Sequence, residues 1–350
     1  MYSSGWDCDV TEVAPKVQLR QLVKEFPITS PVLQRRIGAV HAVSGVSLSV
    51  PAGSTFGLVG ESGCGKTTIG RMIVGLDRPT GGSIIFDGRD VSALSRLERR
   101  RLRRDRQLVF QDPYASLDPR MRVGAILREP LAIHHLGSRS QQRETVVRLL
   151  EEVGLPSDAV NRYPHEFSGG QRQRLGLARA LALNPSLIVA DEPVSALDVS
   201  IRSQMLNLMR ELQRRFNLTY IIISHDLTVV RYVSDLLGVM YLGKLVEVGD
   251  AEAIYSQPAH PYTAALMGAI PVPDPASERI KSHTLIGGEL PSSTNPPPGC
   301  RFHTRCPRAG EVCHTVEPPL RAFGEKQHAA CHFPLKEPTE IRPLKVGSPR

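Results

Sequence analysis

Gly60-Glu61-Ser62-Gly63-Cys64-Gly65-Lys66-Thr67 matches the Gly-x-x-x-x-Gly-Lys-Thr pattern of a phosphate-binding loop. The apolar run at 54–59 before it is typical of a buried strand, and residues 68–76 after it are typical of a helix. Backbone N–H groups beside the glycines bind anionic oxygens, Lys66 reaches the β- and γ-phosphates, and the Thr67 hydroxyl ligates Mg²⁺. Cys64 needs no role beyond being small. The candidate nucleotide-binding residues are Gly60, Glu61, Ser62, Gly63, Cys64, Gly65, Lys66, Thr67 and Thr68.

Outward from this loop, residues 17–249 alternate short β-rich runs with amphipathic helices, which predicts an α/β fold with a largely parallel sheet. Apolar residues at 201, 205, 208, 209, 212 and 216 share one helical face, as a crossover helix between parallel strands requires. A mainly helical insertion is expected at about 113–175, because no comparable strand run occurs there. The strands expected are 54–59, 107–110, 186–190 and 219–224.

Two adjacent carboxylates, Asp191 and Glu192, end the apolar run at 187–190. Successive side chains of a strand point to opposite sides, so the two groups can do different work. We expect Asp191 to hold the Mg²⁺ shell and Glu192 to face the attacking water as a base. Alone, such a pair is usually a strand end that meets solvent; with the phosphate loop upstream, we favour the catalytic interpretation.

A second glycine motif, Ser168-Gly169-Gly170-Gln171, opens an Arg- and Leu-rich helix that Asn184-Pro185 ends. Its serine is a plausible N-cap. The exposed N–H groups at such a helix start would also suit a γ-phosphate. Both interpretations remain open at this point.

The bulk composition is that of a folded globular protein, with 41% hydrophobic and 22% charged residues. No apolar run approaches the roughly 20 residues of a membrane helix. The start of the chain lacks the pattern of a secretion signal, so we expect a cytoplasmic protein. The net charge of +8 would suit anionic lipid or nucleic acid, and seven of the eleven residues at 96–106 are Arg. The alternative is a solvated helix face paired with Glu98 and Asp105.

Four cysteines occur within a Pro-rich region after residue 250, separated by five, six and seventeen residues. In a cytoplasmic protein this favours a metal or cluster over disulfides. The spacing leaves zinc and a [4Fe–4S] cluster equally open. Because these cysteines are remote in sequence from every nucleotide motif, we expect their loss to damage folding or assembly more than ATP chemistry. The four are Cys300, Cys306, Cys313 and Cys331.

The glycine motif at 168–171 resembles the signature motif of ABC ATPases, usually Leu-Ser-Gly-Gly-Gln, with Phe167 in place of the first Leu. Other motifs follow the family order. Gln111 resembles the Q-loop glutamine, Asp198 lies in a stretch similar to the D-loop, and His225 resembles the switch histidine. Phe26 resembles the aromatic residue that stacks on adenine; the alternative is a role in the core. The resemblance implies catalytic roles for Glu192, His225 and Gln111, an Mg²⁺ shell of Thr67, Gln111 and Asp191, and nucleotide contacts by Phe26, Ser168, Gly169, Gly170, Gln171 and Asp198.

Residues 260–266 and 299–307 resemble the C-terminal extension of oligopeptide and dipeptide importer ATPases. That resemblance implies a [4Fe–4S] cluster on the four cysteines, with Zn²⁺ as the alternative. It also implies a P-loop NTPase core of the ABC type with a small irregular extension. We therefore expect a tail at 1–16, a cassette at 17–250, the extension at 251–334 and a flexible tail at 335–350.

The resemblance implies an importer ATPase in which two cassettes enclose two ATP molecules and drive a membrane permease. The second cassette is a copy of this chain or a sister subunit, and an extracellular substrate-binding protein joins through the complex. The protein would lie at the cytoplasmic face of the cell membrane. Rival interpretations are an importer for nickel or another small solute, and a soluble ABC ATPase that acts on nucleic acid or ribosomes. We expect no nucleic-acid partner, because long coiled-coil arms, zinc modules and a second cassette are missing from the sequence.

Overall fold

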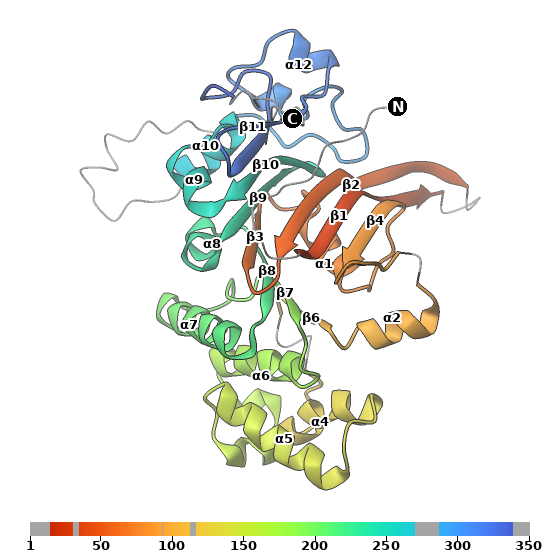
Figure 1. Cartoon of the computed structure of the whole chain (residues 1–350), viewed down its shortest axis with the longest axis vertical. Coiled ribbons are helices and arrows are strands. Elements are labelled where there is room, and N and C mark those ends of the chain that lie inside the picture. The colour runs from red at the N-terminus through yellow and green to blue at the C-terminus, as the bar shows by residue number, and fades with distance from the viewer. Residues whose placement is uncertain (1–14, 31–34, 93, 113–116, 270–286, 339–350) are drawn as a thin grey trace, which may run out of the picture.

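The structure is a computed structural model, which describes residues 15–30, 35–92, 94–112, 117–269 and 287–338 (Figure 1). The expected tails at 1–16 and 335–350 lie almost entirely outside the described residues.

The larger sheet has eight strands in the order β11-β12-β10-β9-β3-β8-β7-β6. The part from β9 to the edge strand β6 is parallel, because β3 pairs in parallel with β8 and β9, and β7 pairs in parallel with β6 and β8. The other end is antiparallel, where β10 pairs with β9 and β12, and β12 with β11. The strands are β3 (Thr55–Val59), β6 (Arg106–Val109), β7 (Leu187–Asp191), β8 (Thr219–Ser224), β9 (Leu236–Tyr241), β10 (Lys244–Asp250), β11 (Leu320–Ala322) and β12 (Gln327–Ala330).

Both faces of the parallel centre are buried, which explains its uninterrupted apolar runs. Along β8, Ile221 and Ile223 join the core that contains Ile69 and Met72 of helix α1 (Lys66–Ile73). Their neighbours Tyr220 and Ile222 join the core of the helical insertion on the opposite face. The period of two along the strand thus ties the phosphate-loop helix and the insertion to one sheet.

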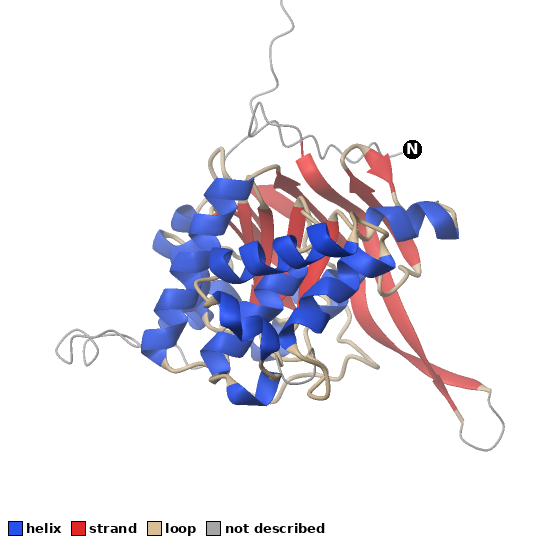
Figure 2. Cartoon of the chain, turned by 90° about the horizontal axis from the view of Figure 1, so that it is seen from below, coloured by secondary structure: helices blue, strands red, loops and turns tan. Residues whose placement is uncertain are grey.

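The insertion is helical, as the sequence predicts, and it packs on the sheet through α6 (Gly169–Leu181). Helices α4 (Val123–Ile133) and α5 (Arg139–Glu152) pack against α6 and against each other. Its two short turns are η1 (Ser157–Asn161) and η2 (Pro164–Glu166). Figure 2 shows the helices gathered over the sheet, with the paired strands β1 and β2 extending beyond them. The other helices are α2 (Arg96–Leu102), α7 (Val199–Phe216), α8 (Leu227–Val233), α9 (Ala251–Ser256), α10 (Pro261–Gly268), η3 (His303–Arg305) and α12 (Val312–Thr315).

A second sheet, in the order β2-β1-β4-β5, is antiparallel throughout. Alternating strands and helices were expected in this region, so this antiparallel sheet was not predicted. Register shifts interrupt the pairing of β1 with β2 and with β4, so a simple alternation of polar and apolar residues is not kept. Its strands are β1 (Pro15–Thr29), β2 (Arg36–Pro51), β4 (Gly81–Phe86) and β5 (Arg89–Asp90).

The segment after residue 250 shares the sheet and the core of the cassette. Strand β12 pairs with β10, with Glu247 opposite Ala329. The Glu247 carboxylate is fully buried and accepts hydrogen bonds from the backbone N–H groups of Ala259 (2.7 Å) and His260 (3.0 Å). A buried carboxylate is costly unless it is hydrogen-bonded, so these contacts fix the chain just beyond the expected boundary. The extension is therefore built onto the cassette.

The arginine-rich stretch divides into exposed and buried parts. Helix α2 begins at a capping box in which Ser95 and Glu98 bond each other's backbone N–H groups. Arg106, at the start of β6, is buried and donates to the carbonyl oxygen of Ile73 (2.7 Å), and burial lowers its pKa to about 10. Glu98 therefore caps α2. One expectation was that Glu98 would pair with the arginines of this stretch. None of the described helices combines the length and the hydropathy needed to cross a membrane.

Candidate active site

The phosphate loop joins β3 to α1 and depends on glycines at two close approaches. Gly60 and Gly65 have φ values of 145° and 103°. A Cβ atom at either position would lie 2.1 Å from a carbonyl oxygen, that of Met240 or that of Ala42. No side chain fits at such a distance, so only glycine allows the loop to close. The loop is thereby pressed against the backbone of strands β9 and β2.

Lys66 is the charge at the centre of this loop. Its Nζ atom donates to the carbonyl oxygens of Gly60 (2.7 Å) and Glu61 (2.9 Å), and the side chain is nearly buried. These bonds hold the ammonium inside the loop, where the phosphates of a nucleotide bind. Burial raises the pKa of Cys64, so this thiol stays protonated and fills space. Ser62, Gly63 and Thr67 are exposed, while Thr68 is half-buried.

Thr67 and Asp191 come together from α1 and β7. The Thr67 hydroxyl donates to Asp191 Oδ1 at 3.1 Å. Burial and the neighbouring Glu192 charge raise the pKa of Asp191, against the hydrogen bond from Thr67. Strand β6 pairs with β7 through Val109 and Ala190, which places Gln111 at the same edge of the sheet, where it is exposed. These oxygen ligands fit Mg²⁺.

Glu192 and His225 form the second half of the site. The backbone N–H of His225 donates to Glu192 Oε1 (3.0 Å), and His225 Nδ1 lies 2.7 Å from the same oxygen. The other carboxylate oxygen, Oε2, is buried and has no hydrogen-bond partner in the described part of the chain. Glu192 holds a left-handed backbone conformation, with φ of 50°, which is strained for a non-glycine residue. His225 therefore fixes one carboxylate oxygen, and the other remains an unused acceptor among the described residues.

The stretch at 168–171, which resembles the signature motif, begins helix α6. This helix and the phosphate-loop helix α1 pack on largely different elements. Ser168 and Gln171 form a capping box, with Gln171 N–H to Ser168 Oγ at 3.4 Å and Ser168 N–H to Gln171 Oε1 at 3.0 Å. Helix α6 packs on α4, α5, α7 and β6, whereas α1 packs on β2, β6, β7 and β8. Ser168 and Asp198 are exposed, and Gly169 and Gly170 are partly exposed. The N-cap interpretation is confirmed. The start of the helix is nevertheless exposed, so the phosphate-binding interpretation stays a prediction.

Phe26 lies in β1 with 39% of its surface exposed, so it is not part of the core. Lys24 Nζ lies 4.9 Å from its ring centroid. The adenine-stacking role stays a prediction.

Two residues beside the phosphate loop were missed by the sequence analysis. The Tyr262 hydroxyl accepts a hydrogen bond from the backbone N–H of Glu61 (3.0 Å), and Arg305 Nη1 lies 2.9 Å from Glu61 Oε2. They follow Glu61 by 201 and 244 residues, and no local pattern signals such contacts. The cysteine-bearing extension therefore touches the phosphate loop despite its distance in sequence, and the expected effect of losing the cysteines stays a prediction.

The four cysteines influence one another electrostatically. Burial raises the pKa of Cys331 to about 12, and the charges of Cys300, Cys306 and Cys313 add to this. The backbone N–H of Cys300 donates to the carbonyl oxygen of Cys313 (2.9 Å). In the residues that the structure describes, however, no group of three or more His, Cys, Asp or Glu side chains is arranged to hold a metal ion. The expected metal or cluster site thus lacks structural support in that respect.

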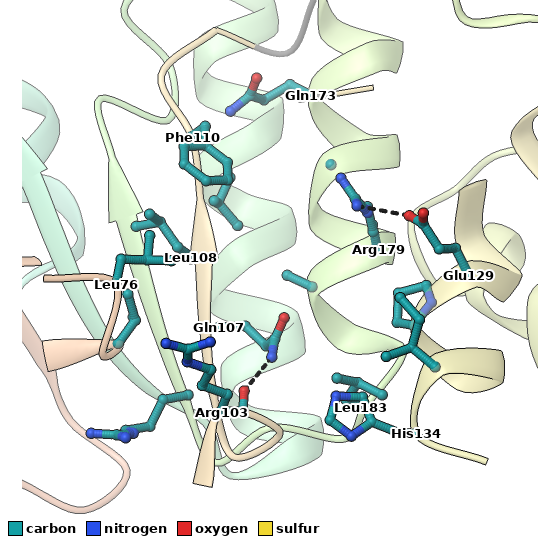
Figure 3. Close-up of a pocket in the computed structure, with 17 residues that line it drawn as sticks. Leu76, Arg103, Gln107, Leu108, Phe110, Glu129, His134, Gln173, Arg179 and Leu183 are labelled. Carbon is teal, nitrogen blue, oxygen red and sulfur yellow. Dashed lines mark hydrogen bonds and ion pairs between the residues drawn. The ribbon is translucent and has the colours of Figure 1, made fainter. Parts of the chain in front are cut away.

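A groove lies between the sheet and the insertion, close to Gln111 (Figure 3). Its cavity measures about 300 Å³ and is lined on one wall by Leu76 and Phe110, and on the other by Ile133 and Leu183. Leu76, Phe110 and Ile133 are 47%, 44% and 50% exposed. Figure 3 shows Arg179 and Glu129, 3.0 Å apart, crossing one side of it. A groove with exposed apolar walls fits a protein segment.

The loop, the acid pair and the histidine define a P-loop nucleoside triphosphatase, and the helix opened by 168–171 places it in the ABC class. The ABC transporter family matches residues 43–195, and the family described as oligopeptide/dipeptide transporter, C-terminal region, matches residues 246–313.

The chain is 51% identical over 318 residues to the oligopeptide transport ATP-binding protein AppF of Bacillus subtilis, covering 91% of this chain and 97% of the relative. It is 52% identical over 295 residues to the putative oligopeptide transport ATP-binding protein YkfD of the same organism, covering 84% and 90%. Among solved structures it is similar to the dimeric MJ0796, a bacterial ABC transporter cassette, with a TM-score of 0.60, 28% identity, and 67% and 98% of the chains covered. The chain belongs to the family of ATP-binding subunits of oligopeptide and dipeptide ABC transporters, and it is an ATPase.

Proposed function

We propose that this chain supplies ATP hydrolysis to an importer of oligopeptides or dipeptides at the cytoplasmic face of the cell membrane. The observation that carries the proposal is the segment at 246–313. It matches the C-terminal region of peptide transporters, and it is joined to the cassette through one sheet. The relatives AppF and YkfD are named for oligopeptide transport.

Within the chain, each group has a defined task. The phosphate loop and Lys66 bind the triphosphate, and Thr67 and Asp191, with Gln111 nearby, would hold Mg²⁺. When bound, Mg²⁺ neutralises charge on the β- and γ-phosphates. Glu192 Oε2 accepts a proton from the attacking water, while His225 fixes the other oxygen of the same carboxylate.

Two cassettes form the working unit. Ser168 and Gly170 are accessible at the start of α6, which packs with the insertion rather than with α1. The proposal places them on the γ-phosphate bound by the other cassette, with Gln171 and Asp198 beside them. The similarity to a cassette solved as a dimer supports this arrangement. The partner is a second copy or a sister subunit.

The groove in Figure 3 is the proposed docking site of the permease. Its walls come from the sheet and from the insertion, so relative movement of these two parts would change its shape. Gln111 lies two residues after the end of β6, between Phe110 of this groove and the edge of the sheet where Mg²⁺ would bind. A Phe110→Asp variant should retain nucleotide binding and lose co-purification with the permease. Unchanged co-purification would refute this docking site.

The four cysteines are proposed to hold a [4Fe–4S] cluster, which needs four thiolates and no other ligand. The mutual influence of their charges supports this, as does the packing of Cys300 and Cys306 against the core that contains Phe302. Protein purified without oxygen should be brown and carry about four irons per chain. One zinc per chain, or no metal, would overturn the cluster.

The decisive experiment is transport by vesicles that contain the co-purified complex and its substrate-binding protein. Labelled di- and oligopeptides should enter only with ATP, and should raise the ATPase rate. Uptake of nickel or another small solute, with no response to peptides, would favour the rival importer. Failure to co-purify with any membrane protein, together with stimulation by nucleic acid or ribosomes, would favour the soluble ATPase.

A further inference from the structure

The phosphate loop is held from outside by the C-terminal extension, at Glu61. Arg305 Nη1 donates to both carboxylate oxygens of Glu61, at 3.1 and 2.9 Å. The Tyr262 hydroxyl accepts from the backbone N–H of the same residue at 3.0 Å. Glu61 directly precedes the turn of the loop, and its carbonyl oxygen accepts from Lys66. Its side chain, N–H and carbonyl oxygen are thus all engaged.

The anchors themselves are rigid. Tyr262 is fully buried, and its ring packs edge-on to Tyr241 at 4.8 Å and tilted against Phe302 at 5.2 Å between centroids. Arg305 donates to the Tyr241 hydroxyl (3.4 Å) and to the carbonyl oxygen of Gly287 (3.1 Å), and its side chain is 8% exposed. A restrained partner loses little entropy when it holds another group in place. The two side chains that bind Glu61 are therefore already fixed in position by their own contacts.

The charge of Glu61 makes this contact important for ATP. A carboxylate on a loop that binds a triphosphate repels that ligand unless a cation neutralises it. Lys66 contacts the carbonyl oxygen of Glu61, not its carboxylate, so the cation that pairs with the carboxylate in the described residues is Arg305. A charge-assisted pair that shields the carboxylate favours nucleotide binding and fixes the loop conformation at the same time.

We propose that Arg305 and Tyr262 are positioning residues of the ATP site, through which the C-terminal extension sets the affinity of the phosphate loop for ATP. They touch neither the nucleotide nor the reacting atoms and act through Glu61. Because the chemistry at Glu192 is left intact, their loss raises the KM for ATP and leaves kcat nearly unchanged.

The test is a double-mutant cycle on the full chain, with binding of AMP-PNP and Mg²⁺ measured by calorimetry. Arg305→Ala should raise the Kd about tenfold, because Glu61 then carries an unpaired charge. In the Glu61→Gln background, the same change should raise the Kd less than about twofold, since no charge remains to be neutralised. The control, Arg308→Ala, removes an exposed arginine of the same extension and should leave the Kd unchanged.

Two further measurements distinguish a positioning role of these residues from a general effect on folding. The salt dependence of the Kd should differ between wild type and Arg305→Ala, because the added repulsion is screened by ions. Tyr262→Phe, which keeps the buried ring, should raise the Kd about threefold with its circular dichroism spectrum unchanged. Equal effects of Arg305→Ala in the two backgrounds, or a kcat loss without a KM rise, would overturn the proposal. Wild-type affinity of folded Tyr262→Phe would remove that residue from it.

Discussion

Replacing Glu192 with Gln separates ATP binding from ATP hydrolysis in this site. Gln has the same shape, and its amide oxygen can still accept the backbone N–H of His225, which lies 3.0 Å from Glu192 Oε1 in the wild type. The amide nitrogen then takes the place of Oε2, which is buried and unpaired in the described structure. An amide nitrogen donates and cannot accept a proton, so the attacking water loses its base.

The expected size of the effect follows from these contacts. General-base assistance contributes about 10²- to 10⁴-fold in rate, which corresponds to about 3 to 5 kcal/mol in the activation barrier. The fold loses far less, because the bond from His225 is kept; we expect a change below about 1 kcal/mol in the free energy of unfolding. The site that binds phosphates, built by Lys66 and Thr67, is untouched.

The assay is steady-state ATP turnover by the reconstituted transporter, with nucleotide binding and denaturant unfolding measured on the same preparation. Glu192→Gln should bind ATP as the wild type does, turn over at least about a hundredfold more slowly, and accumulate the closed dimer. The matched control is Glu252→Gln, the same chemical change at an exposed carboxylate on α9, which should turn over normally. Turnover within a few-fold of wild type by Glu192→Gln would refute the assignment of the base.

Lys66→Ala should raise the Kd for ATP at least about tenfold, as measured by calorimetry, because the lysine charge meets the phosphates already in the ground state. Unchanged affinity would contradict the phosphate-loop assignment. Burial lowers the pKa of His260 to about 3 from its ordinary 6.5, so protons bind the unfolded chain first as pH falls below 6.5. The free energy of unfolding should therefore fall by up to about 1.4 kcal/mol per pH unit below pH 6.5, and His260→Asn should reduce this slope in denaturant titrations; an equal slope would contradict it. Gly65→Ala should abolish ATP binding, since its Cβ would meet a carbonyl oxygen at 2.1 Å, whereas Gly63→Ala, with nothing within 4 Å, should cost only about 1 kcal/mol of unfolding free energy. Equal effects of the two changes on stability and binding would refute this steric argument.

The parts of the fold that could be predicted are those whose signal is local. Apolar runs predicted the parallel strands β3, β6, β7 and β8 but not β9, and β8 was predicted with the bounds that the structure has. The phosphate loop was predicted because its chemistry needs glycines at fixed spacing, and the structure shows the steric reason at Gly60 and Gly65. The pairing of Glu192 with His225 was not predicted, although both residues were; it arises because the neighbouring parallel strands β7 and β8 end at one edge of the sheet.

The missed features depend on pairings between distant segments. The antiparallel sheet of β1, β2, β4 and β5 is disguised by register shifts, and the Asp87-Gly88 turn that joins β4 to β5 was overlooked. The contact of Arg305 with Glu61 spans 244 residues and involves an ordinary arginine in an irregular segment. Composition showed correctly that the region after 250 is Pro-rich, but it did not show that β12 would pair with β10.

That pairing changes how the extension must be understood. Strand β12 attaches to β10, and β9 and β10 are joined by the turn at Leu242 and Gly243, whose N–H donates to the Cys64 carbonyl oxygen in the phosphate loop (2.9 Å). Arg301 donates to the carbonyl oxygen of Leu242 from the cysteine-bearing side. The extension therefore reaches the phosphate loop by a backbone route as well as through Arg305. Disorder in the segment that carries the four cysteines should therefore change the affinity for ATP more readily than it changes the chemistry at the acid pair. The reason is that the same contacts stabilise both the extension and the phosphate loop.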